Sequence, residues 1–245
     1  MVQLSVNINK VATLRNSRGG EVPSLLRAVE VCVDAGVPGI TVHPRADARH
    51  ITEQDVCDVA RGLERHSGAV EYNIEGDPRP ALVRLVEEVR PTQCTLVPVR
   101  PGELTSEAGW PSDTPQAELR TIIDRFRAIG VRVSMFVEAR EEAIAWAAQL
   151  GADRVELYTE PYARAFEQGP EARDASLAQY AAASRYAHAQ GLGINAGHDL
   201  DLDNLPAFVT LPHLDEVSIG HALISRALFV GLDKVVSEYL EITSR

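Results

Sequence analysis

The chain is poor in cysteine, and its three cysteines, Cys32, Cys57 and Cys94, are odd in number and show no CxxC spacing. This pattern excludes a disulfide framework, and we predict free thiols of the core in a reducing cytosol. The HExxH motif and a helical His-x-x-x-His pair are also missing, so no metal site is expected.

Two further absences limit the partners of the chain. No apolar run approaches the roughly 20 residues of a membrane span, and no signal peptide precedes the first predicted strand, so we expect no membrane partner. A basic excess is missing too, because 24 Lys and Arg stand against 35 Asp and Glu for a net charge of −11. That balance argues against a nucleic-acid binder, although a few clustered arginines can hold a small phosphorylated substrate.

The residues that are present indicate a barrel. The 245 residues are 45% apolar and 24% charged, as in globular proteins, and this length suits one α/β barrel. Short β-rich runs alternate eight times with helical stretches, without a Pro/Gly/Ser-rich linker, which indicates parallel strand pairing. The predicted strands cover residues 3–8, 39–43, 69–74, 93–97, 131–136, 154–157, 192–196 and 216–219, and the predicted helices cover residues 23–34, 53–66, 80–88, 116–129, 141–150, 172–190, 202–210 and 222–243. We therefore predict an α/β fold, a single (β/α)8 TIM barrel domain over residues 1–245.

The predicted strands carry an alternation that bears on the barrel interior. Apolar and polar residues alternate over residues 4–9, 70–75, 154–158 and 217–220. If the apolar set faces the helices, the polar set points into the lumen. Because unpaired buried carboxylates are costly, we expect a ligand-filled interior whose carboxylates are candidates for acid–base work.

A histidine stands in the turn after the seventh predicted strand. His198 follows Gly197, which we expect to give the turn backbone freedom, and Asp199 or Asp201 is expected to cap the next helix. An imidazole in this position is exposed at the carboxyl end of a strand, where α/β proteins keep their chemistry. His198 is therefore a candidate for proton transfer, although a surface histidine in a helix-capping loop would give the same pattern.

Cationic residues gather after the first two strands. Residues 43–50 contain two histidines and two arginines, in a chain with seven histidines. Arginine can grip a phosphate with two parallel hydrogen bonds, and histidine transfers protons near neutral pH. Lys10, Arg15 and Arg18 in the first connection are expected to form a cationic rim over the lumen.

Two other strand ends carry candidate groups. Glu75 ends the third strand, where a partly dry barrel would raise its pKa as a general base requires, unless it caps a helix or pairs with Arg79. The last strand runs through Gly220 and His221 into a helix, and helix starts of this kind bind phosphate. The long connections 98–114 and 159–171 follow strand carboxyl ends and are expected to be lids or binding loops.

Taken together, these stretches resemble the pyridoxine 5′-phosphate synthase family, barrel enzymes that close the pyridine ring of vitamin B6. The matching segments are residues 6–18 (VNINKVATLRNSR), 41–45 (TVHPR), 49–52 (RHIT), 94–98 (CTLVP), 195–198 (NAGH) and 219–222 (IGHA). The resemblance implies condensation of 3-amino-2-oxopropyl phosphate with 1-deoxy-D-xylulose 5-phosphate to give pyridoxine 5′-phosphate, phosphate and water. It also implies no metal or organic cofactor, a cytoplasmic location and a homo-octamer.

The resemblance implies roles for individual residues. His43 and Glu75 match proton acceptors of the family and His198 matches a proton donor, while Glu156 matches a residue that stabilises a transition state. Residues matching the aminoketone phosphate site are Asn7, Arg18, Asp199, Gly220 and His221, and those matching the pentulose phosphate site are Asn9, Lys10, Arg45, His50 and Thr105. Some members carry Asp-His in place of Asn9-Lys10, and others carry glycine in place of Asp199. Glu71 stays an alternative to Glu75.

Two expectations follow for tests of function. The connection 98–114, with Thr105 near its middle, is expected to close over the mouth when the pentulose phosphate binds. A non-catalytic phosphosugar-binding barrel has no use for His43, Glu75 and His198 together, and a phosphosugar isomerase or epimerase needs one acid–base pair and one phosphate grip. Both are alternatives to a synthase.

Overall fold

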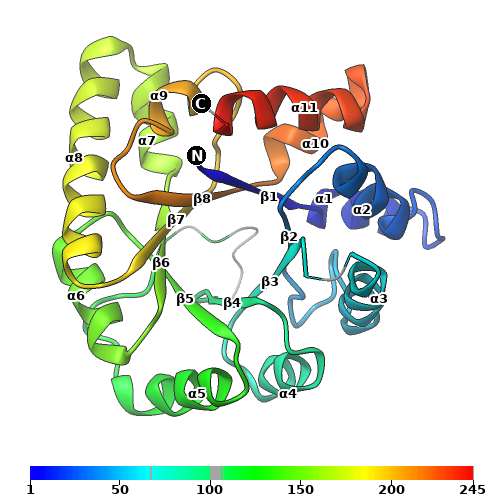
Figure 1. Ribbon diagram of the computed structural model, residues 1–245, viewed down its shortest axis with the longest axis horizontal. Coiled ribbons are helices and arrows are strands. Elements are labelled where there is room, and N and C mark those ends of the chain that lie inside the picture. The colour runs from blue at the N-terminus through cyan, green and yellow to red at the C-terminus, as the bar shows by residue number, and fades with distance from the viewer. Residues whose placement is uncertain (67, 100–105, 107, 245) are drawn as a thin grey trace.

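A computed structural model describes residues 1–66, 68–99, 106 and 108–244 of the chain. Within this range eight parallel strands form a closed barrel in the order β1-β2-β3-β4-β5-β6-β7-β8, with the helices around it (Figure 1). The strands are β1 (Gln3–Asn7), β2 (Gly39–Val42), β3 (Glu71–Gly76), β4 (Gln93–Leu96), β5 (Arg132–Val137), β6 (Arg154–Tyr158), β7 (Gly193–Gly197) and β8 (Leu214–Ile219). The predicted (β/α)8 barrel is confirmed, and each predicted strand overlaps an observed one.

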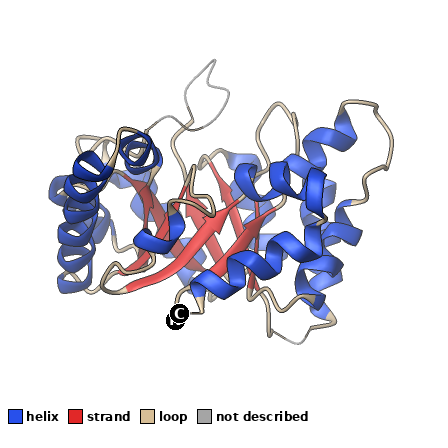
Figure 2. Cartoon of the chain, turned by 90° about the horizontal axis from the view of Figure 1, so that it is seen from above, coloured by secondary structure: helices blue, strands red, loops and turns tan. Residues whose placement is uncertain are grey.

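Helices flank the strands on the outside of the barrel, as the blue and red elements of Figure 2 show. They are α1 (Asn9–Asn16), α2 (Leu25–Asp34), α3 (Glu53–Glu64), α4 (Pro80–Val89), α5 (Gln116–Ala128), α6 (Glu141–Leu150), α7 (Glu160–Glu167), α8 (Pro170–Ala189), α9 (Leu205–Phe208), α10 (His221–Val230) and α11 (Leu232–Thr243). In the described part of the chain, no helix has the length and apolar character that a membrane crossing needs.

One predicted loop and two predicted helices differ from the structure. The connection 159–171 contains α7, whose Tyr162 is fully buried, so this segment is packed structure and not an open loop. The helix predicted over residues 222–243 is divided at Gly231, which has φ +93° and separates α10 from α11. The helix predicted over residues 202–210 is shortened to α9, because the preceding residues form a turn on the Asp201 carboxylate.

The middle of the lumen is a layer of small polar side chains, as the alternation predicted. The Ser5 and Thr41 hydroxyls are 2.7 Å apart, and Asn73 donates from Nδ2 to Thr41 Oγ1 at 3.3 Å. Thr95 donates from Oγ1 to Asn73 Oδ1 at 3.1 Å. Inward side chains of β1 to β4 therefore satisfy one another across adjacent strands, and the apolar faces of the strands pack on the helices.

The amino end of the lumen holds a connected set of charged and amide groups, which we call the amino-end network. Its members are Glu71, Gln93, Arg132, Arg154, Asn195 and Glu216. Arg132 pairs with Glu71 and donates from Nε to Gln93 Oε1 at 2.9 Å, while Arg154 Nη1 lies 3.5 Å from Glu216 Oε2. The network places Glu71 in the lumen as predicted, and pairs it with an arginine far from the carboxyl ends of the strands.

Two further features of the fold concern the cysteines and the chain ends. Cys32 and Cys94 are buried free thiols and Cys57 is a half-buried one, as predicted. Val2 donates its backbone N–H to the carbonyl of Thr243 at 3.0 Å, so the first strand and the last helix are joined. The two ends of the chain lie side by side below the strands, at the amino end of the barrel (Figure 2).

Candidate active site

The carboxyl ends of the strands surround a cavity of about 540 Å³, which we call the lumen cavity. A volume of this size is typical of small-molecule sites. The cavity is lined by most of the residues singled out from the sequence, namely Asn7, Asn9, Lys10, His43, Arg45, His50, Glu75, Glu156, His198, Asp199, Gly220 and His221. Residues singled out from six separate parts of the sequence therefore meet in one cavity.

Two predicted site residues are not among those lining the cavity. Arg18 is exposed and lies outside its lining, and Thr105 lies outside the described residues, as does most of the connection 98–114 on which the lid prediction depends. The lining also includes Thr13, Arg49, Ser106, Leu200, Ser218, Ile219 and Ala222. Ser218 was visible in the sequence as a polar member of the last strand, and Arg49 as part of the segment 43–50.

His43 and Glu75 face each other deep in the lumen cavity. The His43 Nδ1 atom is 3.7 Å from Glu75 Oε2, and both side chains are less than 10% exposed. Burial, together with the charge of Glu216, raises the pKa of Glu75 to about 8. Burial is the largest cause that lowers the pKa of His43, and the nearby His50 ring and the Arg45 guanidinium lower it further. Although the distance would allow an ion pair, both shifts favour a neutral imidazole beside a protonated carboxyl at neutral pH.

Two asparagines hold Glu75 and His43 in place through hydrogen bonds. Asn7 donates from Nδ2 to Glu75 Oε2 at 3.4 Å, and its own Oδ1 accepts from the backbone N–H of Asn9 at 3.1 Å. Asn9 Oδ1 accepts from the backbone N–H of His43 at 2.9 Å. The contact that Asn9 makes needs only an acceptor oxygen, which its amide supplies.

The turn after β7 places His198 differently from the sequence prediction. His198 and Asp199 adopt positive φ angles of 87° and 57°, whereas Gly197 does not. A Cβ at Gly197 would lie 2.5 Å from Glu156 Oε1, so the glycine is needed for close approach of this carboxyl and not for left-handed backbone. Thr159 Oγ1 donates to the Gly197 carbonyl at 2.6 Å, which holds the turn against β6.

An apolar wall lies beside His198 at the carboxyl ends of β4 to β6. Val97, Phe136 and Tyr158 form a buried cluster separate from the main core. The His198 ring is 4.9 Å from the Phe136 ring and 5.4 Å from the Tyr158 ring, centroid to centroid. His198 was predicted to be exposed, but it is half-buried. Burial lowers its pKa. The sequence held a signal for the wall, because Phe136 is two residues after the inward Ser134.

Glu156 is the most enclosed carboxyl of the cavity lining. Its side chain is 2% exposed, and Oε2 has no hydrogen-bond partner among the described residues. Burial and the charges of Glu75 and Glu216 raise the pKa of Glu156 well above its usual range. A neutral carboxylic acid in this position can donate a hydrogen bond to charge that develops in the cavity.

One side of the cavity is cationic. Lys10, Arg45, Arg49 and His50 line it together, and they come from the segments that follow β1 and β2. His50 Nδ1 accepts from the backbone N–H of Ile51 at 2.9 Å, while burial and the charge of Arg45 lower the His50 pKa to about 4. His50 is therefore a neutral imidazole with its proton on Nε2, a donor suited to an anionic ligand.

A helix start lies next to this cationic side, because β8 pairs with β1. Gly220 and His221 begin α10 at the end of β8, and the backbone N–H groups of such a start attract anions. A Cβ at Gly220 would lie 3.0 Å from Cβ of Asn7, so glycine lets β8 pass close to β1. The cavity thus offers two separate places for negatively charged groups.

Several alternatives from the sequence are wrong. Arg15 does not form part of a cationic rim, because its guanidinium binds both carboxylate oxygens of Asp55 at 2.6 and 2.8 Å. Glu75 does not pair with Arg79, which instead pairs with Asp77 and donates to the Pro44 carbonyl at 2.6 Å. The described residues contain no group of three or more His, Cys, Asp or Glu arranged to hold a metal ion.

Comparison with known proteins agrees with this geometry. A family model described as "Pyridoxal phosphate biosynthesis protein PdxJ" matches residues 4–245. The chain is 50% identical over 240 residues to pyridoxine 5′-phosphate synthase of Porphyromonas gingivalis, covering 98% of both chains. It is 51% identical over 249 residues to pyridoxine 5′-phosphate synthase of Xanthomonas oryzae pv. oryzae, covering 98% of this chain and 96% of that one.

Solved structures of more distant proteins share the fold. Thiamine phosphate pyrophosphorylase from Pyrococcus furiosus has a TM-score of 0.64 at 13% identity, covering 99% of this chain and 96% of that chain. Phosphoribosyl anthranilate isomerase from Thermotoga maritima has a TM-score of 0.63 at 11% identity, covering 100% and 99%. At such low identities the likeness shows only that the barrel fold is shared. The family model, in contrast, matches nearly the whole sequence. The chain belongs to the PdxJ family of pyridoxal phosphate biosynthesis proteins.

Proposed function

We propose that this enzyme condenses 3-amino-2-oxopropyl phosphate with 1-deoxy-D-xylulose 5-phosphate to give pyridoxine 5′-phosphate, phosphate and water. The observation that supports the proposal is one cavity whose lining combines titratable groups at the floor with two separate anion-attracting features. Two phosphorylated substrates need two anion sites, and a ring closure with several proton transfers needs more than one acid or base.

The two phosphates are assigned to two separate places in the lumen cavity. In this proposal the pentulose phosphate is held by Asn9, Lys10, Arg45 and His50, which include three nitrogen donors on the cationic side. The aminoketone phosphate is held at the start of α10 by Asn7, Asp199, Gly220 and His221. Asp199 would contribute its backbone, because a carboxylate side chain repels phosphate. Arg18 and Thr105 stay predictions for these two sites.

The proton transfers are assigned to the groups at the floor. The lowered pKa of His43 keeps its imidazole neutral and able to accept a proton at neutral pH. Glu75 becomes a proton acceptor when it is ionised, which its pKa of about 8 places in a usable range. In the proposal His198 donates a proton from its ring N–H against the apolar wall, and Glu156 stabilises charge in the transition state.

The experiment that tests the proposal follows product and phosphate together. Purified protein is incubated with both substrates, and pyridoxine 5′-phosphate absorbance and inorganic phosphate release are measured, with either substrate omitted as a control. A synthase forms both products only when both substrates are present. A phosphosugar isomerase or epimerase would alter one substrate alone, and a binding barrel would form nothing.

We also propose that the enzyme works in the cytoplasm as a homo-octamer. The family resemblance supports this assembly, and so do apolar side chains at the end of α10, where Leu228 is 67% and Phe229 is 87% exposed. Exposed apolar residues of this kind mark protein contacts when they gather. In sedimentation velocity the wild type should sediment as an octamer, and Phe229→Asp should shift the protein toward smaller species.

A further inference from the structure

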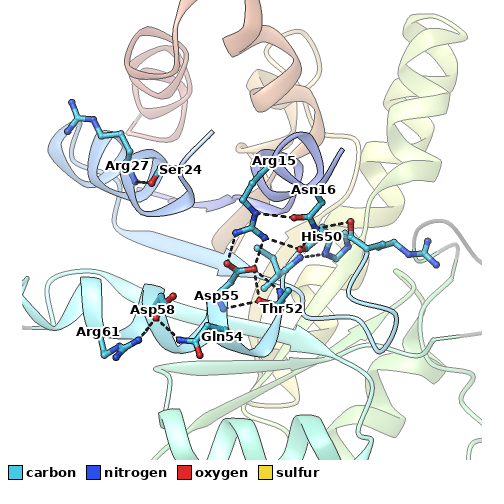
Figure 3. Close-up of polar contacts among 12 residues, drawn as sticks. Arg15, Asn16, Ser24, Arg27, His50, Thr52, Gln54, Asp55, Asp58 and Arg61 are labelled. Carbon is cyan, nitrogen blue, oxygen red and sulfur yellow. Dashed lines mark hydrogen bonds and ion pairs between the residues drawn. The ribbon is translucent and has the colours of Figure 1, made fainter. Parts of the chain in front are cut away.

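An ion pair outside the lumen cavity ties α1 to α3. Arg15, in the last turn of α1, donates from Nη1 to Asp55 Oδ1 at 2.6 Å and from Nη2 to Asp55 Oδ2 at 2.8 Å. The side chains are only 14% and 12% exposed. A bidentate pair of this kind fixes direction as well as distance, and Figure 3 shows it between the two helices.

Asp55 is itself held rigidly at the start of α3. Thr52 donates its backbone N–H to Asp55 Oδ2 at 2.9 Å, and the backbone N–H of Asp55 donates to Thr52 Oγ1 at 3.1 Å. This reciprocal capping box satisfies backbone groups that the helix leaves unpaired. The carboxylate that receives Arg15 is thus a fixed part of the scaffold.

The contact continues from Arg15 toward the cavity. Arg15 donates from Nε to Asn16 Oδ1 at 3.0 Å, which leaves the Asn16 amide nitrogen to donate to the carbonyl of His50 at 2.8 Å. Arg15 Nη2 reaches the same carbonyl at 3.5 Å. The end of α1 therefore holds the backbone of His50, whose ring lines the cavity on its cationic side.

The His50 ring is oriented by the residue that follows it. Ile51 donates its backbone N–H to Nδ1 at 2.9 Å, so a shift in the backbone at His50 would break this bond and release the ring. The carbonyl of His50 and the N–H of Ile51 belong to the same peptide unit, so both hydrogen bonds depend on the orientation of one group. Loss of the Asn16–His50 hydrogen bond would therefore weaken the hydrogen bond from Ile51 to the His50 ring.

We propose that Arg15 is a positioning residue for ligand binding: the chain of contacts Asp55–Arg15–Asn16 fixes the His50 backbone, so that the ring presents its Nε2–H to an anion. The inference rests on the proposed function only for the identity of that anion, the phosphate of the pentulose. Arg15 itself touches no ligand. Its loss weakens one of the two anion sites and leaves the site at the start of α10 intact.

Matched variants separate positioning from a loss of stability. Arg15→Ala removes the ion pair and the contact with Asn16, and Asn16→Ala removes the contact with His50 while the ion pair remains. Arg15→Lys keeps the charge without the fork that binds two carboxylate oxygens and Asn16 together. Arg61→Ala is the control, because Arg61 pairs with Asp58 on the exposed side of the same helix α3 (Figure 3).

Two measurements are made on each variant. Calorimetric titration with 1-deoxy-D-xylulose 5-phosphate, and separately with inorganic phosphate and 3-amino-2-oxopropyl phosphate, gives the dissociation constants. Nitrogen chemical shifts of the His50 imidazole report which ring nitrogen carries the proton. For Arg15→Ala and Asn16→Ala we expect about tenfold weaker binding of the pentulose phosphate, the cost of one lost hydrogen bond to a charged group, and a mixture of His50 tautomers.

The outcomes are distinct. Unchanged pentulose phosphate binding and an unchanged His50 tautomer in both Arg15→Ala and Asn16→Ala would overturn the inference, whatever their melting temperatures. Equal weakening of both phosphosubstrates would overturn it too, as would the same effect in Arg61→Ala. If Arg15→Ala does not fold, Asn16→Ala decides. If the wild type forms no pyridoxine 5′-phosphate, the proposed function fails, while the tautomer and the titration with inorganic phosphate still test positioning.

Discussion

The two ends of the barrel lumen contain similar residue types in opposite circumstances. In the amino-end network, Arg132 pairs with Glu71 and Arg154 lies 3.5 Å from Glu216, so the acidic groups face guanidinium groups. At the carboxyl end, Glu75 and Glu156 have no such partner in the contacts among described residues. Buried charge is therefore compensated at one end and suppressed by protonation at the other.

The difference shows how one lumen separates stability from chemistry. Pairing favours the ionised form of a carboxyl, as Arg154 does for Glu216, although burial still raises the Glu216 pKa to about 7. An unpaired buried carboxyl takes a proton and can release it later. Unpartnered atoms occur lower down as well, at Gln93 Nε2 and Ser134 Oγ within the described residues, but these are neutral groups. The titratable atoms without partners, His43 Nε2 and Glu156 Oε2, both face the end where the cavity lies.

The largest expected effect separates a histidine of the cavity from one at the amino end. His198→Ala should lower kcat at least about 100-fold, the usual contribution of a proton donor, while both phosphosubstrates still bind at their own sites. The control is His213→Ala, because His213 is an exposed residue that precedes β8 and stacks on His188 at 3.7 Å. Steady-state kinetics decide, and a His198→Ala enzyme with more than about a tenth of wild-type kcat would contradict the assignment.

A second comparison sets Glu75 against Glu71 on the same strand. Because the pKa of Glu75 is raised to about 8, the carboxyl is protonated below that pH, and kcat/KM of the wild type should rise as pH passes through this value. Glu75→Gln should lower kcat/KM about 100-fold and remove this rise. Glu71→Gln should keep both the rate and the pH profile, since Glu71 is bound to Arg132. A flat wild-type profile between pH 7 and pH 9 would count against Glu75 as a base.

The same substitution at two glycines of β7 compares the carboxyl end of the lumen with its amino end. Gly197→Ala places a Cβ 2.5 Å from Glu156 Oε1, so the carboxyl must move, and kcat should fall about tenfold from this displacement. Gly193→Ala places a Cβ 2.8 Å from Arg154 Cγ in the amino-end network and should lower the melting temperature while kcat stays near the wild-type value. Equal loss of kcat in both variants would show that the two ends are not separate in function.

The smallest effect concerns stability and its pH dependence. Glu156 has a pKa raised above its usual value near 4.5, so the folded state keeps a proton that the unfolded state releases, and stability falls as pH rises above about 4.5. Glu156→Gln lacks this loss. Its melting temperature should exceed that of the wild type at pH 7.5 by about 2–4 °C for each kcal/mol gained, with a smaller difference at pH 5. Calorimetry that finds no growth of the difference with pH would contradict the neutral state of Glu156.

Much of the site was predictable because the barrel converts local sequence patterns into spatial ones. Alternation over residues 70–75 sufficed to put Asn73 and Glu75 in the lumen, since side chains of a strand alternate between two faces. Closure then brings strand ends together whatever their distance in sequence. His43, Glu75 and His198 could therefore be assigned to one cavity without knowledge of any contact.

The predictions that failed depend on contacts between distant residues. The spacing of Arg15 and Arg18 suggested a shared face, but the direction of Arg15 is set by Asp55, which is 40 residues away in sequence. Local signals were sometimes present and outweighed: Tyr162 and Phe166 are four residues apart in α7, a helical spacing in a segment predicted as a loop. The contact between Arg15 and Asp55 joins residues that are distant in sequence, so no short stretch of sequence encodes it.

The hydrogen bond between Val2 and Thr243 has a consequence for engineering. With the two chain ends adjacent and on the opposite end of the barrel from the cavity, a short linker could join them and new termini could be opened in an outer connection. Circular permutation of this kind is tolerated where ends are close and exposed. A permuted chain cut between α5 and β5 should keep the barrel, and fusion partners attached beside Val2 or Thr243 should leave substrate entry unobstructed.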